Sequence, residues 1–334
     1  MPELRRDPLT GTWVVLAHER GARPTEYRLT DERTTLEDCP FCPGHEAATP
    51  RAIVEVPGPA GWLARVFANR YPALVVEATR AAEGVGVYDR MDGVGAHEVV
   101  VESREHDLRW HSLGAAGIQR VLELWQARLR DLSRDARLEH AVVFKNSGAQ
   151  AGATLDHPHS QIVALPFVPP AAQTRLDRAA THHAWHGRCL LCDILRQERG
   201  AADRLVVEGA LSAAWCPYAS RVGFEVMVAP TVHESSFEAS SARVIADVAS
   251  TLGQLFAALH QTLPNVSYNI VVQGAPLRSS PLAHAHWYLE ILPVLSRQAG
   301  FEWGSGMFIN STAPETAAGY LRERRARPST LSHG

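Results

Sequence analysis

The chain repeats one order of motifs, and this repeat limits its possible folds more than any other feature. Each half has a Cys-x-x-Cys pair, an apolar strand pattern, a histidine, an amphipathic helix pattern, a second apolar strand and a His-x-His segment. His106 precedes His157 by 51 residues, and His233 precedes His284 by the same 51 residues. We therefore predict an internal duplication, with an N-terminal half over residues 1–175 and a C-terminal half over residues 176–334.

The two halves are predicted to be of the α+β class, each an antiparallel sheet backed by a long helix. Apolar strand patterns occur at residues 97–102 and 141–144, and again at 224–230 and 268–272. Between the strands of each half, apolar residues recur at helical spacing, at Ile118, Val121 and Trp125 in the first half and at Ile245, Val248 and Leu252 in the second.

Each half also contains two cysteines and two histidines that we predict to be metal ligands. These are Cys39, Cys42, His106 and His157, followed by Cys189, Cys192, His233 and His284. Two thiolates and two imidazoles complete a tetrahedral Zn²⁺ site, so we predict two structural zinc ions per chain. The alternative, buried thiols beside unrelated histidines, does not explain the equal spacing. Cysteines in such pairs also favour a reducing compartment over a disulfide framework.

The segment from Asn146 to Gln161 carries the candidate chemistry. Two histidines two residues apart on an extended segment leave the same face of the backbone, so His157 can bind metal while His159 faces a substrate. Gly152 and Thr154, with Asn146, offer N–H groups and short donors that can surround a phosphate.

The corresponding segment of the second half lacks these features. Its loop contains two prolines, and the equal spacing aligns Trp287 and Tyr288 with Ser160 and Gln161. We therefore predict that the first half carries the chemistry and that His286 is a packing residue.

A neutral imidazole whose other nitrogen bonds a backbone carbonyl is a good nucleophile toward phosphorus. We predict that His159 forms a covalent nucleotidyl intermediate, which a second acceptor resolves. Gln161 can hold a phosphate oxygen but cannot deliver a proton, and a phosphate leaving group does not need one. A hydrolase that released a poorer leaving group would require a histidine at that position.

These residues resemble the galactose-1-phosphate uridylyltransferase family of the histidine-triad superfamily over nearly the whole chain. The matching stretches are residues 5–13, 19–24, 39–42, 67–69, 146–161 and 284–286. The resemblance implies a duplicated histidine-triad fold with half-barrel sheets, and a His159 that takes a nucleoside monophosphate from a nucleotide sugar. It also implies a homodimer. The residues implied to bind substrate are Asn69, Asn146, Gly152, Thr154, Ser160 and Gln161, with Arg20 and Arg23 lent to the partner's site.

Several departures from the family pattern leave the acceptor open. Ser160 replaces a glycine of the best-known members, and Arg175 and Gln273 stand where those members have a glutamate and a histidine as metal ligands. Ser160 and the second Cys-x-x-Cys pair look more like the branch that includes ADP-glucose phosphorylase, which transfers the nucleotide to inorganic phosphate.

Our first prediction for the acceptor is a sugar 1-phosphate, read by the run 301–310 with Glu302 or Asn310 bonding to sugar hydroxyls. Transfer to inorganic phosphate and a catalytically silent nucleotide-binding module are the alternatives. Both uridine and adenosine stay open as the base.

Composition argues against two classes of partner. The chain has 33 Lys+Arg against 36 Asp+Glu and no block of like charge, so it lacks the basic footprint of a nucleic-acid-binding protein. No apolar run approaches the ~18–20 residues of a membrane span, and the N-terminus lacks an apolar signal core. We expect a cytoplasmic protein without a nucleic-acid or membrane partner.

Overall fold

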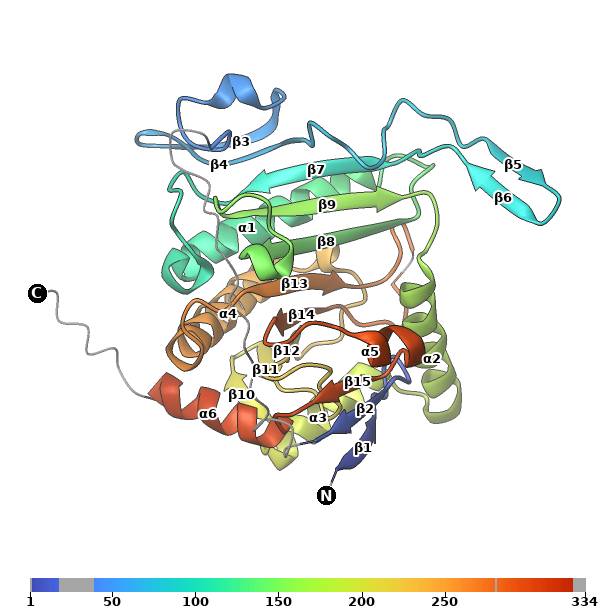
Figure 1. Cartoon of the computed structure of the whole chain (residues 1–334), viewed down its shortest axis with the longest axis vertical. Coiled ribbons are helices and arrows are strands. Elements are labelled where there is room, and N and C mark those ends of the chain that lie inside the picture. Colours follow the sequence, from blue (N-terminus) through green and yellow to red (C-terminus); the bar gives the residue numbers. More distant parts are fainter. Residues whose placement is uncertain (1, 18–38, 280, 327–334) are drawn as a thin grey trace, which may run out of the picture.

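The computed structural model describes residues 2–17, 39–279 and 281–326. Its centre is one open sheet of ten strands, in the order β10-β11-β12-β14-β13-β8-β9-β7-β4-β3 (Figure 1). The first half contributes β3 (Ala52–Gly58), β4 (Gly61–Ala68), β7 (Ala96–Val101), β8 (His140–Ser147) and β9 (His159–Leu165). The second half contributes β10 (Leu205–Glu208), β11 (Ser212–Trp215), β12 (Val226–Pro230), β13 (Tyr268–Gln273) and β14 (Tyr288–Pro293).

The halves meet where β8 pairs antiparallel with β13. Read outward from this junction, the strands follow the same order in both directions, 8-9-7-4-3 on one side and 13-14-12-11-10 on the other. This symmetry confirms the predicted duplication and the α+β class. The sheet stays open and does not close into a barrel.

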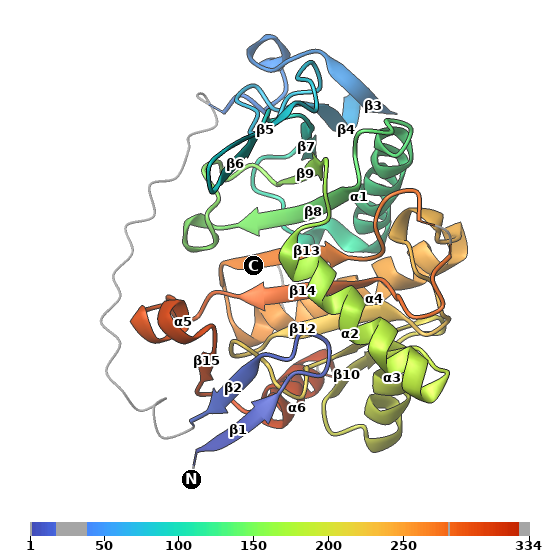
Figure 2. The same ribbon diagram turned by 90° about the vertical axis from the view of Figure 1, so that its right-hand side faces the viewer.

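Two long helices, α1 (Trp110–Leu132) and α4 (Ala242–Thr262), pack against each other behind the sheet (Figure 2). Their predicted apolar faces, which include Ile118, Trp125 and Ile245, are fully buried in the main core. By length and composition α4 would also suit a membrane span, but 56% of its apolar window is buried inside the protein. The sheet thus has one face covered by helices.

The remaining elements surround this layer. The helices are α2 (Pro170–His186), α3 (Leu190–Ala201), α5 (Gly300–Ser305) and α6 (Pro314–Ala326), with 3-10 turns η2 (Glu46–Ala48), η3 (Ala149–Ala151) and η4 (Phe237–Ala239). Strands β1 (Glu3–Arg6), β2 (Trp13–Leu16) and β15 (Phe308–Asn310) form a small sheet, and β5 (Ala82–Val85) and β6 (Tyr88–Met91) form a hairpin that projects from the body (Figure 1). The predicted division after residue 175 falls within α2, and its exact place stays a prediction.

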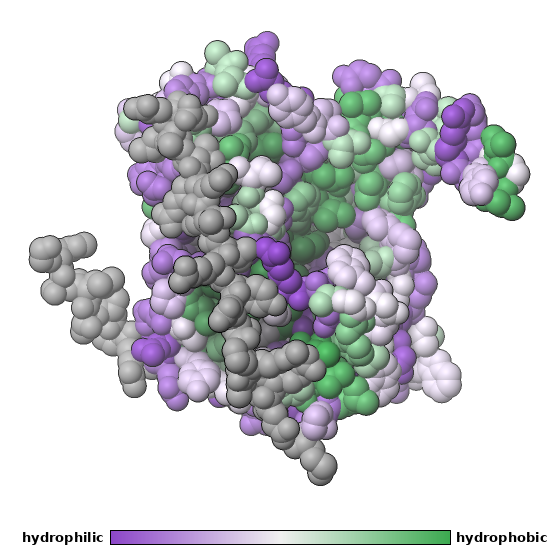
Figure 3. Space-filling view, in the orientation of Figure 1, coloured by the Kyte–Doolittle hydropathy of each residue, from purple (hydrophilic) through white to green (hydrophobic). Residues whose placement is uncertain are grey.

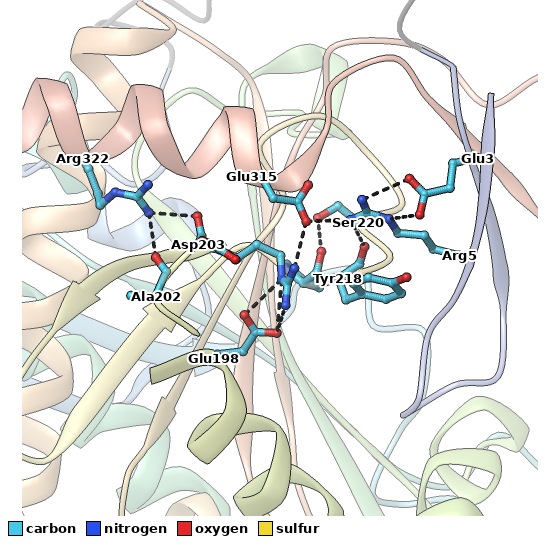
Figure 4. A network of polar contacts seen from close by, with 11 residues as sticks. Glu3, Arg5, Glu198, Ala202, Asp203, Tyr218, Ser220, Glu315 and Arg322 are labelled. Carbon is cyan, nitrogen blue, oxygen red and sulfur yellow. Dashed lines mark hydrogen bonds and ion pairs between the residues drawn. The ribbon is translucent and has the colours of Figure 1, made fainter. Parts of the chain in front are cut away.

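An ion-pair network joins the N-terminal strand to the C-terminal helix (Figure 4). Glu315 on α6 accepts from Arg5 and from Arg204, each at 2.8 Å. Arg204 also pairs with Glu198 of α3 at 2.9 Å, and both of these side chains are buried. Because each charge has an opposite partner, burial here does not leave an uncompensated charge. The network thereby holds the N-terminal strand β1 and the C-terminal helix α6 against the second half of the chain.

The opposite face of the sheet, toward the viewer in Figure 1, is where the predicted site lies. Along β9, Ile162 and Ala164 point into the core against the helices, so His159 and Gln161 point to this open face. In Figure 3 the face is hollowed below the β5–β6 hairpin, and apolar side chains line much of the hollow.

Candidate functional site

The loop at residues 146–154, which the sequence predicts to hold a phosphate and which is called the phosphate loop below, begins at the end of β8 and is shaped by two glycines. Gly148 has φ of 85°, and a Cβ there would lie 2.2 Å from Ser267 Oγ, so no other residue fits without a shift. Gly152 also has a positive φ, 86°, and faces the Asn146 amide. The two glycines thus turn the chain on either side of η3, and the second turn brings Gly152 back beside the Asn146 side chain.

One nitrogen of the His159 imidazole is hydrogen-bonded, and the other has no hydrogen bond in the part of the chain that the structure describes. Its Nδ1 lies 2.8 Å from the His157 carbonyl oxygen, which can only accept, so Nδ1 carries the proton and Nε2 is bare. The side chain is 7% exposed, and burial holds the pKa of His159 below its ordinary value. Phe41 packs against the ring with centroids 5.3 Å apart. A neutral imidazole in this state is suited to act as a nucleophile.

A buried ion pair lies under the strand that carries His159. Lys145 Nζ donates to Glu102 Oε2 at 2.8 Å and to the His159 carbonyl at 3.1 Å. Trp110 Nε1 donates to the same Glu102 oxygen at 2.8 Å. These bonds hold the backbone of His159 from the helix side of the sheet.

Gln161 lies on the same face as His159, with its amide oxygen held. Its Oε1 lies 2.8 Å from His97 Nε2, and Asn69 Nδ2 lies 3.1 Å from that same nitrogen. The Gln161 amide nitrogen has no hydrogen bond within the described residues. The structure therefore brings Asn69 and Gln161 together at one end of the site through His97.

Asn146 sits on the other side of His159, at the start of the phosphate loop. Its Oδ1 accepts from Asn269 Nδ2 at 2.8 Å, and its Nδ2 lies 3.5 Å from the Gly152 carbonyl, at the limit of a hydrogen bond. Thr154 is exposed and makes no side-chain hydrogen bond in the part of the chain that the structure describes. Asn146, Gly152 and Thr154 thus border the open face near His159.

Ser160 requires a correction, because its side chain faces away from the site. Its Oγ accepts from Trp125 Nε1 at 2.8 Å on the helix side, and the residue is 1% exposed. Side chains alternate along a strand, so a residue between His159 and Gln161 must point to the opposite face. Arg20 and Arg23, also predicted to bind substrate, lie outside the described residues.

The first predicted metal set is assembled in the structure. Cys39, Cys42, His106 and His157 are all buried, and their ligand atoms lie within 4.8 Å of one another. His157 donates from Nε2 to the Ser103 carbonyl at 2.8 Å, which leaves Nδ1 bare and 3.5 Å from Cys42 Sγ. Burial lowers the pKa of His157 to about 4, so the imidazole is neutral, as a metal ligand must be. This donor set fits a tetrahedral metal ion.

The second set is also assembled, but with one ligand corrected. It consists of Cys189, Cys192, His233 and His286, so the fourth ligand is His286 and not His284. His286 Nδ1 lies 3.4 Å from Cys192 Sγ, and its Nε2 donates to the Pro230 carbonyl at 3.1 Å, which repeats the arrangement of His157. His284 instead lies near His183, with ring centroids 6.4 Å apart.

The error has a structural cause. In each half the ligand stands two residues before the first residue of a strand, His157 before β9 at His159 and His286 before β14 at Tyr288. The second half therefore has two more residues between its paired histidines, and the equal 51-residue spacing pointed to the wrong one. In this register Tyr288 corresponds to His159, so the packing role predicted for His286 was also wrong.

In the second half, the face that corresponds to the site is closed by its own polar contacts. Glu290, two residues after Tyr288 as Gln161 is after His159, accepts from Arg221 at 2.8 Å and from Gln273 at 2.7 Å. Arg175 on α2 donates in turn to Gln273. These groups satisfy one another, and they include Arg175 and Gln273, the two residues that the sequence analysis gave as departures from a second metal site.

One cleft connects the phosphate loop with the C-terminal run. It has a volume of about 1130 Å³ and is lined by residues that include Gly148, Gly152, Arg297 and Trp303. Asn310 does not face it as a free group: it is 2% exposed, donates to the Ser220 carbonyl and accepts from the Thr312 N–H. The proposed bond from Asn310 to a sugar hydroxyl was therefore wrong.

Two residues near the amides, His97 and Asn269, were missed by the sequence analysis. His97 was part of a predicted strand and Asn269 of another, and period-two alternation could have placed each on one face. Their partners depend on the pairing of β7 with β9 and of β8 with β13, which local sequence does not specify.

Comparison with known proteins identifies the family. The family model for galactose-1-phosphate uridyl transferase, N-terminal domain, matches residues 1–169. ADP-glucose phosphorylase of Arabidopsis thaliana is 32% identical over 96% of this chain and 93% of its own length. Galactose-1-phosphate uridylyltransferase of Thermotoga maritima is 29% identical over 97% of this chain and 98% of its own.

A solved structure agrees with the sequence relatives. The crystal structure of ADP-glucose phosphorylase from Arabidopsis thaliana with bound ADP-glucose has a TM-score of 0.84 and 31% identity, covering 97% of this chain and 99% of that one. The chain is thus an enzyme with a duplicated α+β fold. It belongs to the galactose-1-phosphate uridylyltransferase family, as its motifs predicted.

Replacing each of the two paired histidines tests the corrected metal set. We expect His286→Ala to lower the metal content from two ions per chain to one, because it removes a ligand of the second cluster. His284→Ala is the matched control and should retain both ions. Elemental analysis of the purified variants measures this, and loss of metal in His284→Ala with retention in His286→Ala would restore the original assignment.

The two clusters should release metal at different rates. All four residues of the first cluster are buried, whereas His233 is exposed and Cys192 half-buried in the second. A chelating dye should therefore remove one ion quickly and the other slowly. Cys192→Ser should abolish the fast phase and Cys39→Ser the slow one. Release in a single phase, or a fast phase that survives in Cys192→Ser, would contradict this difference.

Proposed function

We propose that this chain is a nucleotidyltransferase that moves a nucleoside monophosphate from a nucleotide sugar to a second phosphate through a covalent nucleotidyl-His159. The observation that supports this most directly is the His159 tautomer, with Nδ1 bonded to the His157 carbonyl and Nε2 bare on the open face. Gln161 lies two residues further along the same strand, β9, and Asn146 lies on the neighbouring strand, β8, so that their amides can hold a phosphate on either side of His159.

In the proposed first step, the lone pair of His159 Nε2 attacks the α-phosphorus of the nucleotide sugar. The P–N bond forms while the bond to the bridging oxygen breaks, and the sugar 1-phosphate leaves with that electron pair. In the second step an oxygen of the acceptor phosphate attacks the same phosphorus, and the P–N electrons return to Nε2. Neither step needs proton transfer to a leaving group, which is consistent with an amide at Gln161.

The two Cys₂His₂ clusters are proposed to hold structural Zn²⁺. Their donor sets of two sulfurs and two imidazole nitrogens suit this ion and leave no ligand position open for substrate. The first cluster would act on the reaction only through His157, whose carbonyl orients His159.

We further propose a homodimer, in which Arg20 and Arg23 reach the partner's site. The projecting β5–β6 hairpin supports an interface because Val85, Val87 and Tyr88 are 71%, 89% and 77% exposed. All five cysteines are free, which suits the reducing cytoplasm.

For the acceptor, a sugar 1-phosphate is our first candidate. The cleft that joins the phosphate loop to Trp303 and Arg297 borders Gly148 and Gly152 but not His159 itself, and in it Arg297 offers a cation for a phosphate of the acceptor. Inorganic phosphate, with ADP-glucose as donor, is the second candidate. It is favoured by the engagement of Asn310 and by the similarity to ADP-glucose phosphorylase.

The nucleophile can be tested by intact-mass measurement after mixing the protein with UDP-glucose or ADP-glucose. We expect one nucleoside monophosphate per active chain in the native protein and none in His159→Asn, because the amide cannot replace the imidazole as a nucleophile. Metal content and circular dichroism should be unchanged in that variant, and His284→Asn should keep the adduct. An adduct that persists in His159→Asn would reject the assignment. If the native protein forms no adduct with either donor, the silent binding module is favoured.

The acceptor can be tested on the isolated adduct, freed of donor. Glucose 1-phosphate, galactose 1-phosphate and inorganic phosphate are offered separately, and loss of the adduct mass is followed. We expect a sugar phosphate to discharge it faster than phosphate, and Trp303→Ala to slow only the sugar phosphates, since Trp303 lines the cleft and is 77% exposed. Equal discharge by phosphate, unaffected by Trp303→Ala, would favour the phosphorylase.

A further inference from the structure

We propose that His97 and Asn269 are positioning residues that turn the amide groups of Gln161 and Asn146 so that both present their NH₂ to the nucleotide phosphate. The inference rests on the proposed function and adds two residues to its site. Neither residue is assigned to touch the phosphate; each acts through the amide in front of it.

Amide orientation matters because a primary amide is a donor on one side and an acceptor on the other. A phosphate oxygen only accepts, so an amide that presents its oxygen repels the anion. An amide without other hydrogen bonds can present either its oxygen or its NH₂ to the site. A donor on the side away from the site binds the oxygen, so the NH₂ faces the site before substrate binds.

The hydrogen bonds of His97 determine which nitrogen carries its proton. The Ala73 backbone N–H donates to Nδ1 at 3.1 Å, so Nδ1 is bare and the neutral ring carries its proton on Nε2. The Tyr71 N–H donates to Asn69 Oδ1, which identifies the other amide atom, beside His97, as Nδ2. An amide nitrogen does not accept, so Asn69 is not the partner of that proton. The Nε2–H thus donates to Gln161 Oε1 at 2.8 Å, and the Gln161 NH₂ faces the site.

The same reasoning fixes Asn146 from the other half of the molecule. Asn269 lies opposite Asn146 in the β8–β13 pair, and one of its amide atoms lies 2.8 Å from the Ala151 carbonyl. A carbonyl only accepts, so that atom is Nδ2. Because it also lies 2.8 Å from Asn146, it must meet the oxygen of that amide. The Asn146 NH₂ is then directed toward the phosphate loop, with Nδ2 3.5 Å from the Gly152 carbonyl oxygen, at the limit of a hydrogen bond.

Two substitutions of His97 separate positioning from packing. In His97→Asn the side-chain oxygen can still accept from Ala73, but the donor to Gln161 is lost. In His97→Gln the amide nitrogen can reach the position of Nε2, so the donor is kept. We expect His97→Asn to slow formation of the nucleotidyl adduct about tenfold in a single turnover, and His97→Gln to stay within about threefold of the native rate.

Double variants show whether each residue acts through its amide. His97→Asn should have no further effect in a Gln161→Ala background, and the isosteric Asn269→Leu should have none in an Asn146→Ala background. Additive losses, or a His97→Gln variant as slow as His97→Asn, would overturn the positioning role. A native protein that forms no adduct rejects this inference with the proposed function. If the native protein forms the adduct and the His97→Asn and Asn269→Leu variants form it at the same rate, the positioning role is rejected and the proposed function is not.

Discussion

His157 links the first Cys₂His₂ cluster to His159, the proposed nucleophile, and the rest of the site depends on its three polar contacts. Its Nδ1 faces Cys42, its Nε2–H donates to the Ser103 carbonyl, and its own carbonyl accepts from His159 Nδ1. The ring is thereby fixed at both nitrogens, and the backbone that carries its carbonyl is fixed with it. The position of the His157 carbonyl oxygen therefore determines the tautomer of His159, and no acidic or basic side chain is needed to set it.

The second half keeps the same framework without the same chemistry. Its ligand His286 bonds to Cys192 and Pro230 as His157 does to Cys42 and Ser103, so the cluster survives. Two residues further on, Tyr288 stands where the first half has His159, and its side chain is buried. Glu290 would repel a phosphate, and it is neutralised by Arg221. A buried charge such as that of Glu290 needs an opposite partner. The paired Glu290 and Arg221 then occupy the face of the second half on which a ligand would bind.

The sequence predicted the duplication because both halves keep the same order of cysteine pair, strands, helix and paired histidines. It failed at His284 because the second half has two more residues before β14, so its equivalent histidines stand 53 residues apart against 51 in the first half, and counting alone does not reveal this. Ser160 could have been placed correctly, since strand alternation puts it opposite His159 and Gln161. Asn310 could not, because its partner Ser220 is 90 residues away in the sequence.

The junction of β8 with β13 makes the loop at residues 146–154 depend on the second half of the chain. Without β13, β8 would be an edge strand with unpaired backbone groups beside the phosphate loop that follows it. With β13 in place, Asn269 stands opposite Asn146 and bonds both that side chain and the Ala151 carbonyl within the loop. The loop is then held on one side by its own glycines and on the other by the second half. A loop held in this way loses less conformational entropy when it surrounds an anion. The duplicated sheet therefore supports the site through the pairing of its two central strands.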